Sequence, residues 1–191
     1  MPAPLILRLS KAACVAAIAL FASLVVFGNV TDYGTNWAFV QHVLAMDTIF
    51  PDSTIRWRAV TDPALQQAAY VAIIAAEAMT ALLCWIGVIR LLAARSAPAP
   101  AFAAAKGFAI AGLTLGFLLW QVGFMSIGGE WFAMWQSQQW NGIKCGRSPS
   151  TQSTPSWRRP CISSVWATAW IAQRSAGSSA TAARPEYSAV A

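Results

Sequence analysis

Residues 68–89 read AAYVAIIAAEAMTALLCWIGVI, and they are apolar throughout except for one carboxylate, Glu77, near the middle. A helix of about 20 apolar residues spans the ~30 Å hydrocarbon core of a bilayer. The stretch therefore predicts a membrane-spanning helix with an acid near mid-depth. Asp62 and Pro63 precede it, which is typical of a helix start because proline is tolerated in the first turn.

Two further apolar runs have the length of a span. They cover residues 12–30 and residues 107–127. The first run has a basic start, as a secretory signal peptide does, but it is longer than the usual ~7–15 apolar residues and lacks a clear small-x-small cleavage site. A retained helix is therefore favoured. The three runs predict an all-α fold, a polytopic transmembrane helical bundle within a membrane domain of residues 1–142.

Charge is scarce and unevenly distributed. Only 10% of the 191 residues are charged and 57% are hydrophobic, whereas soluble domains carry about 25% charged residues. Residues 1–141 hold seven Lys/Arg and six Asp/Glu, a net of +1, so most of the chain's +6 belongs to the segment that follows. The body has no basic patch with interleaved aromatics, and nucleic acid is not an expected partner.

The basic residues of the body predict its orientation. Most of them flank the start of the first run or follow the second, namely Arg8, Lys11, Arg90, Arg95 and Lys106. Because Lys and Arg are enriched in cytoplasmic loops, the N-terminus is expected in the cytoplasm and the connection 31–63 outside. We therefore expect a multi-pass protein of the cell inner (plasma) membrane.

Both outer segments are rich in aromatic residues. Within the connection, Trp37, Val40 and Leu44 recur at i, i+3 and i+7, which predicts a short amphipathic helix at the membrane surface. After the third run, the pair Gly128 and Gly129 is expected to end the helix. Three tryptophans follow, at positions 131, 135 and 140, and an interfacial aromatic belt is favoured over a binding platform.

Glu77 is the strongest candidate for chemistry, and two interpretations stay open. A charged side chain at the centre of a spanning helix costs roughly 2.5–3.5 kcal/mol on insertion scales. A protonated Glu77 can donate an interhelical hydrogen bond, for which Thr80, Ser23 and Thr114 are the candidate partners. A titrating Glu77 can relay protons or bind a cation. The small, apolar residues on its face favour the hydrogen bond.

A second group of candidates lies on the predicted outer side. It comprises His42, Asp47, Asp52, Arg56, Arg58, Glu130 and Gln136. A His–Asp pair can perform acid–base chemistry, but a separation of five residues does not align His42 and Asp47 on one helix face. No GxSxG, Walker A, GxGxxG or HExxH motif occurs. Capping and salt bridges are therefore favoured over catalysis.

Neither a metal site nor a cofactor is expected. The four cysteines, at positions 14, 84, 145 and 161, form no CxxC, and His42 is the single histidine. Gly112 and Gly116 form a GxxxG pair, which allows close approach of a neighbouring helix. This pair is a candidate face for a homo-oligomer.

Several long strings carry a family resemblance: VTDYGTNWAFVQHVLAMDTIFP at 30–51, WRAV at 57–60 and GGEWFAMWQSQQWNG at 128–142. They resemble a bacterial family of predicted small integral membrane proteins, domain of unknown function 2165, over residues ~5–142. The resemblance implies four transmembrane helices, the fourth directly after WNG. The family has no established activity, so no catalytic residue is carried over.

The chain departs from this pattern after Gly142. A Ser/Arg/Pro-rich tail, residues 143–191, takes the place of the fourth helix and is expected to be largely disordered. One hypothesis is a frameshift near codons 142–146, and the alternative is a genuine tail. If neither of the other two reading frames encodes about 20 apolar residues there, the frameshift is rejected.

The leading functional prediction is a non-enzymatic structural or accessory membrane subunit. Its partners would be the lipid bilayer and a second copy or a larger membrane complex. The alternative is a small proton-linked transporter or carrier that uses Glu77. A membrane enzyme acting at the outer surface is the weakest of the three interpretations.

Overall fold

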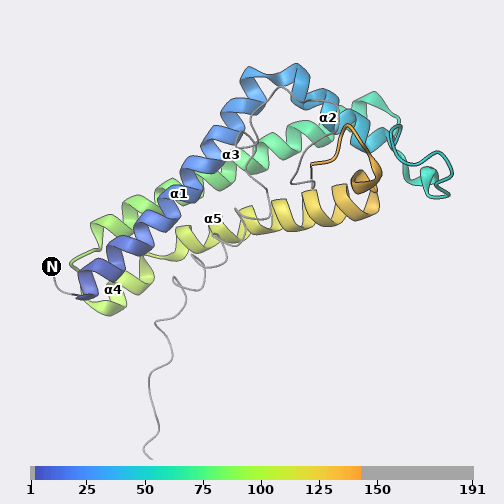
Figure 1. The fold of residues 1–191 in the computed structure, drawn as a ribbon. Coiled ribbons are helices and arrows are strands. Elements are labelled where there is room, and N and C mark those ends of the chain that lie inside the picture. The colour runs from blue at the N-terminus through green and yellow to red at the C-terminus, as the bar shows by residue number, and fades with distance from the viewer. Residues whose placement is uncertain (1–2, 143–191) are drawn as a thin grey trace, which may run out of the picture.

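The computed structural model describes residues 3–142, and every regular element in that range is a helix (Figure 1). The elements are α1 (Ala3–Thr31), α2 (Tyr33–Ala45), η1 (Arg56–Arg58), α3 (Pro63–Ala93), α4 (Ala99–Ala104), α5 (Gly107–Leu118), η2 (Leu119–Trp131) and η3 (Met134–Gln136). The predictions for residues 143–191, a largely disordered tail in place of the implied fourth helix, lie outside the described residues.

Three stretches are long and apolar enough to cross a membrane: Pro4–Thr31, Pro63–Ala93 and Ala99–Trp131. The predicted all-helical fold and its three spans are confirmed. Each helix runs past the ends of its apolar run, because polar and basic residues at the ends continue the helical hydrogen bonding. The start of α3 is as predicted, since Asp62 Oδ1 accepts a bond of 2.8 Å from the Ala64 N–H and Pro63 opens the helix.

Two features of the third span differ from the sequence-based expectation. The span begins before the apolar run 107–127, because the Pro/Ala-rich segment ahead of it contains α4, and Gly128 and Gly129 do not end the helix. From Leu119 onwards the turns widen, and the Phe132 N–H donates to the Ile127 carbonyl five residues earlier, at 2.9 Å. At membrane depth an unpaired backbone group is costly, so glycines are kept within the helix rather than breaking it.

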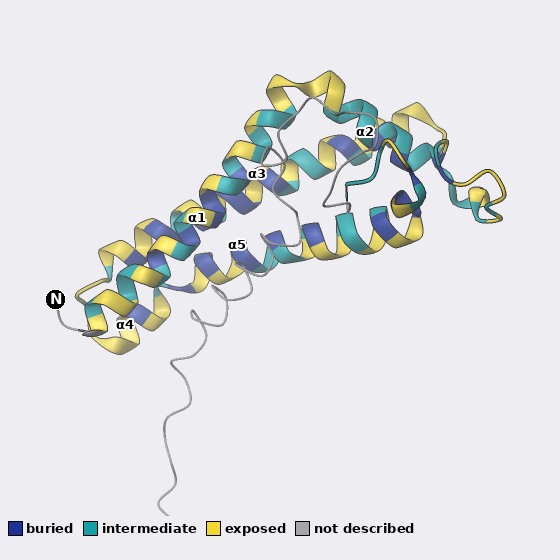
Figure 2. Ribbon diagram, viewed as in Figure 1, coloured by how far each residue is buried: buried dark blue, intermediate teal, exposed yellow. Residues whose placement is uncertain are grey.

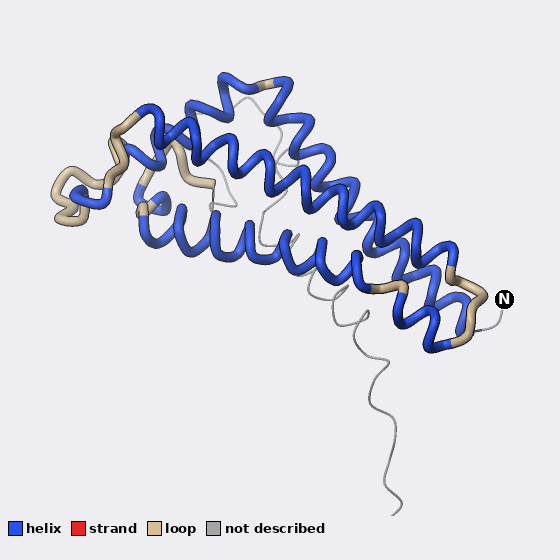
Figure 3. Tube along the Cα trace, turned by 180° about the vertical axis from the view of Figure 1, so that it is seen from behind, coloured by secondary structure: helices blue, strands red, loops and turns tan. Residues whose placement is uncertain are grey.

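Helix α3 lies between α1 and α5 and packs along both, as the views from the two sides show (Figures 1 and 3). Small residues allow this packing. A Cβ built on Gly87 would lie 2.6 Å from Cα of Ala109 on α5, and Ala19 and Ala22 of α1 are fully buried. The core of the half that holds the start of α1 is formed by Ala12, Val15, Ile18, Ala19, Cys84, Val88, Leu91, Phe102, Ala109 and Leu113.

A cap closes the end of the bundle opposite the start of α1, which is called the outer end after the predicted orientation. It consists of α2, the segment 46–62 and the stretch around η3 (Figure 1). The predicted helix around Trp37 is present as α2, and its apolar side buries Val40 and Val43. The cap has a core of its own, made of Val43, Met46, Ile49, Phe132, Ala133 and Met134.

The outward faces of the long helices remain exposed and apolar, and Figure 2 shows exposed stripes along the bundle. On α1 and α3 they include Leu20, Leu24, Phe27, Val71, Leu82 and Ile89. Lipid tails are as apolar as these side chains, so such faces suit a membrane rather than water.

Candidate functional site

Glu77 lies inside the bundle, midway along α3, and is 1% exposed. Asn29, in the last turn of α1, donates a hydrogen bond of 2.6 Å from Nδ2 to Glu77 Oε2. The carboxyl group is therefore tied to a neighbouring helix. A buried acid without such a partner would carry the full cost of leaving water.

Two of the hydroxyl partners expected for Glu77, Thr80 and Ser23, were wrong. Thr80 and Ser23 donate instead to carbonyl oxygens one turn earlier in their own helices, each at 2.8 Å. Such back-bonding satisfies a hydroxyl locally at membrane depth, where no water is available. Asn29 was missed because it stands at the very end of the first apolar run, where a polar residue indicates the end of a span. Only the antiparallel packing of α1 on α3 brings it to Glu77.

Further polar groups extend from Glu77 toward the outer end. The Tyr70 hydroxyl donates to the Asn29 carbonyl at 3.2 Å. The Tyr33 ring packs against Tyr70 with centroids 4.9 Å apart, and Gln67 Nε2 donates to the Tyr33 hydroxyl. We call these residues the Glu77 column: Glu77, Asn29, Tyr70, Tyr33 and Gln67. Glu77 and Tyr70 are buried and Asn29 is partly buried, whereas Tyr33 and Gln67 are exposed.

His42 and Asp47 form a direct contact, with 2.6 Å between Nδ1 and Oδ2. The two residues do not share one helix face, as their spacing predicted, but they meet across the end of the helix. Helix α2 ends at Ala45, and Met46 takes a left-handed conformation with φ of 51°, so the chain turns back between the two residues. The Trp140 ring stacks on His42, with centroids 4.6 Å apart.

The remaining outer candidates occupy separate places. The Arg58 guanidinium carbon lies 5.4 Å from the Trp57 ring and 4.6 Å from the Trp131 ring, and Nη1 donates to the Trp131 carbonyl. Gln136 accepts from the Phe50 N–H at 3.3 Å, and Glu130 is exposed on η2. Among residues 3–142, no group of three His, Cys, Asp or Glu side chains could hold a metal ion.

The glycine pair on α5 faces α3 of the same chain. A Cβ on Gly112 would lie 2.7 Å from Cys84 Sγ, and one on Gly116 would lie 3.0 Å from Thr80 Cγ2. The pair thus allows a close helix approach, but within one molecule. In the single chain this face is occupied by α3, and a homo-oligomer through Gly112 and Gly116 stays a prediction.

Comparison with known proteins identifies one family. Residues 7–149 match the family described as predicted small integral membrane protein (DUF2165). No curated protein and no solved structure matches the chain.

Proposed function

The chain belongs to the DUF2165 family of predicted small integral membrane proteins, and from that premise we propose that it is a non-enzymatic structural or accessory subunit of the inner membrane. The contact between Glu77 and Asn29 carries this proposal. The acid is 1% exposed, and its hydrogen-bond partner lies on another helix of the same chain. Glu77 thus serves helix packing, which suits a structural role. The candidate residues of the outer side do not form a catalytic arrangement.

Charge supports an orientation with the N-terminus in the cytoplasm. Of the seven basic residues in the described part, five lie at the end of the bundle that holds the start of α1 and the α3–α4 turn. Arg56 and Arg58 are the two at the other end. Short loops rich in Lys and Arg stay on the cytoplasmic side, so α2 and the cap would face outward.

The exposed apolar faces support a role in a larger assembly as well as in lipid. Three helices give the chain little interior volume of its own, while α1 and α3 offer broad outward surfaces with large side chains. A partner's spanning helices would pack there through van der Waals contact, which drives helix association in membranes.

Native mass measurement of the tagged chain, extracted in a mild detergent, tests the proposal. The expected result is a complex heavier than the 20.4 kDa chain and not a multiple of it, with the same partner recovered in two detergents. A monomer, or a pure homo-oligomer, in both detergents would contradict an accessory role.

The Glu77 column favours a second candidate, a proton-linked transporter or carrier. Buried Tyr70 and partly buried Asn29 stand between Glu77 and the exposed pair Tyr33 and Gln67, and intramembrane acids commonly mark proton paths. Proteoliposomes with an internal pH dye test this function. Proton flux that is lost in Glu77→Gln and kept in the surface control Glu130→Gln would support transport, and absence of flux in the wild type would reject it.

A further inference from the structure

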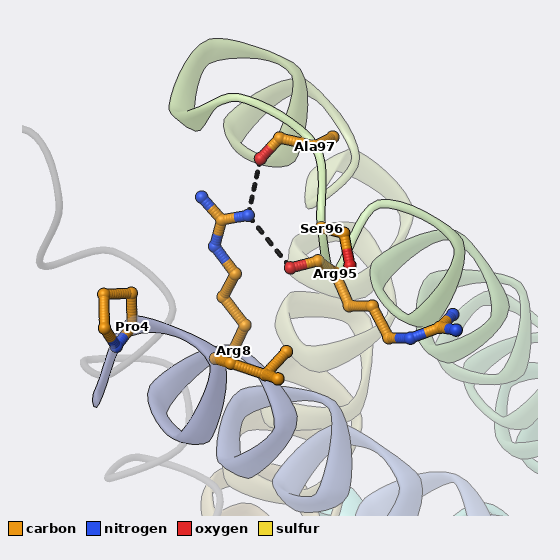
Figure 4. Close-up of a pocket in the computed structure, with 6 residues that line it drawn as sticks. Pro4, Arg8, Arg95, Ser96 and Ala97 are labelled. Atoms are coloured by element: carbon orange, nitrogen blue, oxygen red, sulfur yellow. Dashed lines mark hydrogen bonds between the residues drawn. The ribbon is translucent and has the colours of Figure 1, made fainter. Parts of the chain in front are cut away.

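A pocket of about 350 Å³ opens at the basic end of the bundle. It lies between the first turns of α1 and the turn that joins α3 to α4 (Figure 4). Its lining residues are Pro4, Leu5, Arg8, Arg95, Ser96 and Ala97. The volume falls at the lower end of the range of ligand pockets, roughly 300–1,000 Å³.

Arg8 is held in place inside this pocket. Its Nη1 donates to the carbonyl of Arg95 at 3.0 Å and to that of Ala97 at 2.6 Å, as Figure 4 shows. The guanidinium carbon also lies 4.7 Å from the centre of the Phe102 ring. Neither hydrogen bond uses Nε or Nη2, which carry the other donors of the guanidinium. An arginine fixed in this way loses little conformational freedom when it binds an anion.

The charge around the pocket is of one sign. The described basic residues at this end are Arg8, Lys11, Arg90, Arg95 and Lys106. The described acids, Asp32, Asp47, Asp52, Asp62, Glu77 and Glu130, all lie at the outer end or inside the bundle. The pocket therefore carries a positive potential that attracts anions from the membrane surface.

We propose that this pocket binds the phosphate group of an anionic ligand, with a net-negative phospholipid headgroup as the favoured source. Arginine recognises phosphate through paired N–H donors, and basic pockets between spanning helices bind such headgroups. Pro4 and Leu5 form an apolar wall, and the adjacent Ile6 and Leu7 are 50% and 63% exposed. These apolar neighbours suit acyl chains and favour a lipid over a soluble phosphate ester. The site does not depend on Glu77 or on an accessory role.

Native mass spectrometry of the full chain in detergent, with added lipid, tests the site. Phosphatidylglycerol is the probe and phosphatidylcholine is the zwitterionic comparison. Ser96→Asp places a carboxylate on the exposed rim of the pocket and keeps both carbonyl acceptors of Arg8, which belong to Arg95 and Ala97. Ser10→Asp is the matched control, because Ser10 is exposed at the same end but does not line the pocket. We expect Ser96→Asp to weaken phosphatidylglycerol binding roughly tenfold and Ser10→Asp far less.

A second variant and a competitor complete the test. Arg8→Gln should also lose phosphatidylglycerol binding, whereas Arg56→Gln at the outer end should keep it. Glycerol 3-phosphate that displaces the lipid would identify a soluble phosphate ester as the ligand, and failure to displace it would identify the lipid. Equal retention of both lipids by the wild type, or equal loss in Ser96→Asp and Ser10→Asp, would overturn the proposal in favour of a diffuse basic surface.

Discussion

Asn29 and Glu77 form a polar contact that joins α1 to α3 inside the bundle. Hydrogen bonds between membrane helices contribute modestly, on average about 0.6 kcal/mol with a maximum near 1.7, because the separated helices also find partners. The contact therefore adds little to the free energy of unfolding. Its main effect is to favour one arrangement of α1 on α3 over the alternatives. Slippage by one turn would leave the Glu77 carboxyl group without Asn29.

Truncation of both residues should reveal this coupling. In a double-mutant cycle, Asn29→Ala and Glu77→Ala should be non-additive by roughly 0.6–1.7 kcal/mol. The measurement is reversible unfolding in mixed micelles. Thr31→Ala is the control for Asn29→Ala, since the exposed Thr31 hydroxyl donates only to the Phe27 carbonyl of its own helix. Additivity of Asn29→Ala with Glu77→Ala would contradict an energetic link.

The His42–Asp47 pair should matter much less for stability. Both side chains are substantially exposed, at 35% and 46%, and exposed ion pairs contribute about 0–1 kcal/mol. We expect Asp47→Asn to change the free energy of unfolding by less than ~1 kcal/mol, measured in the same way. A larger loss would indicate that the turn after α2 depends on the charge of Asp47.

At the scale of the element, glycine lets α3 and α5 approach closely. A Cβ on Gly87 would lie 2.6 Å from both Cα and N of Ala109. Backbone atoms cannot turn aside as a side chain can, so the helices themselves would have to separate. At Gly116 the nearest atom is a threonine methyl at 3.0 Å, which a small shift can relieve.

Gly87→Ala should therefore be more damaging than Gly116→Ala. We expect a loss of about 1–3 kcal/mol, the usual cost of overpacking, measured by unfolding in micelles. Gly28→Ala in α1 is the matched control, because nothing lies within 4 Å of its Cβ position. The control should be neutral or stabilising by up to ~1 kcal/mol, as alanine favours helix. Equal effects of the two changes would rule out close packing at Gly87.

The sequence predicted those helices whose position is set by neighbouring residues in the chain. Apolar runs marked the three spans, and Asp62 with Pro63 marked the start of α3. The features that the sequence did not predict depend on tertiary packing or on the surroundings of the chain. The partner of Glu77 depends on how α1 packs, and the helix through Gly128 and Gly129 depends on surroundings without water. The His42 contact depends on a helix end that falls between the two residues.

At the scale of the whole molecule, polarity is divided along the long axis. Basic residues gather at the end that holds the α3–α4 turn, aromatic side chains gather in the cap, and apolar faces lie between them. Trp57, Trp131 and Trp135 are exposed on the cap, as suits the headgroup region of a bilayer. This division fits one orientation, with the pocket around Arg8 in the cytoplasm.

Cysteine labelling in intact cells tests that orientation. In a chain whose four native cysteines are replaced, Thr54→Cys on the exposed cap loop should react with a membrane-impermeant thiol reagent. Ser96→Cys on the α3–α4 turn should react only after the membrane is permeabilised. The reverse pattern would place the N-terminus outside and contradict the charge rule.

The stacking of Trp140 on His42 has a consequence for reporter fusions. It holds the last described residues against α2, at the end of the molecule opposite the start of α1 (Figure 1). An odd number of crossings separates these two positions, so a reporter joined before α1 and one joined at Gly142 would report different compartments. A periplasm-dependent phosphatase and a cytoplasm-dependent fluorescent protein, exchanged between the two positions, would each be active at one junction only.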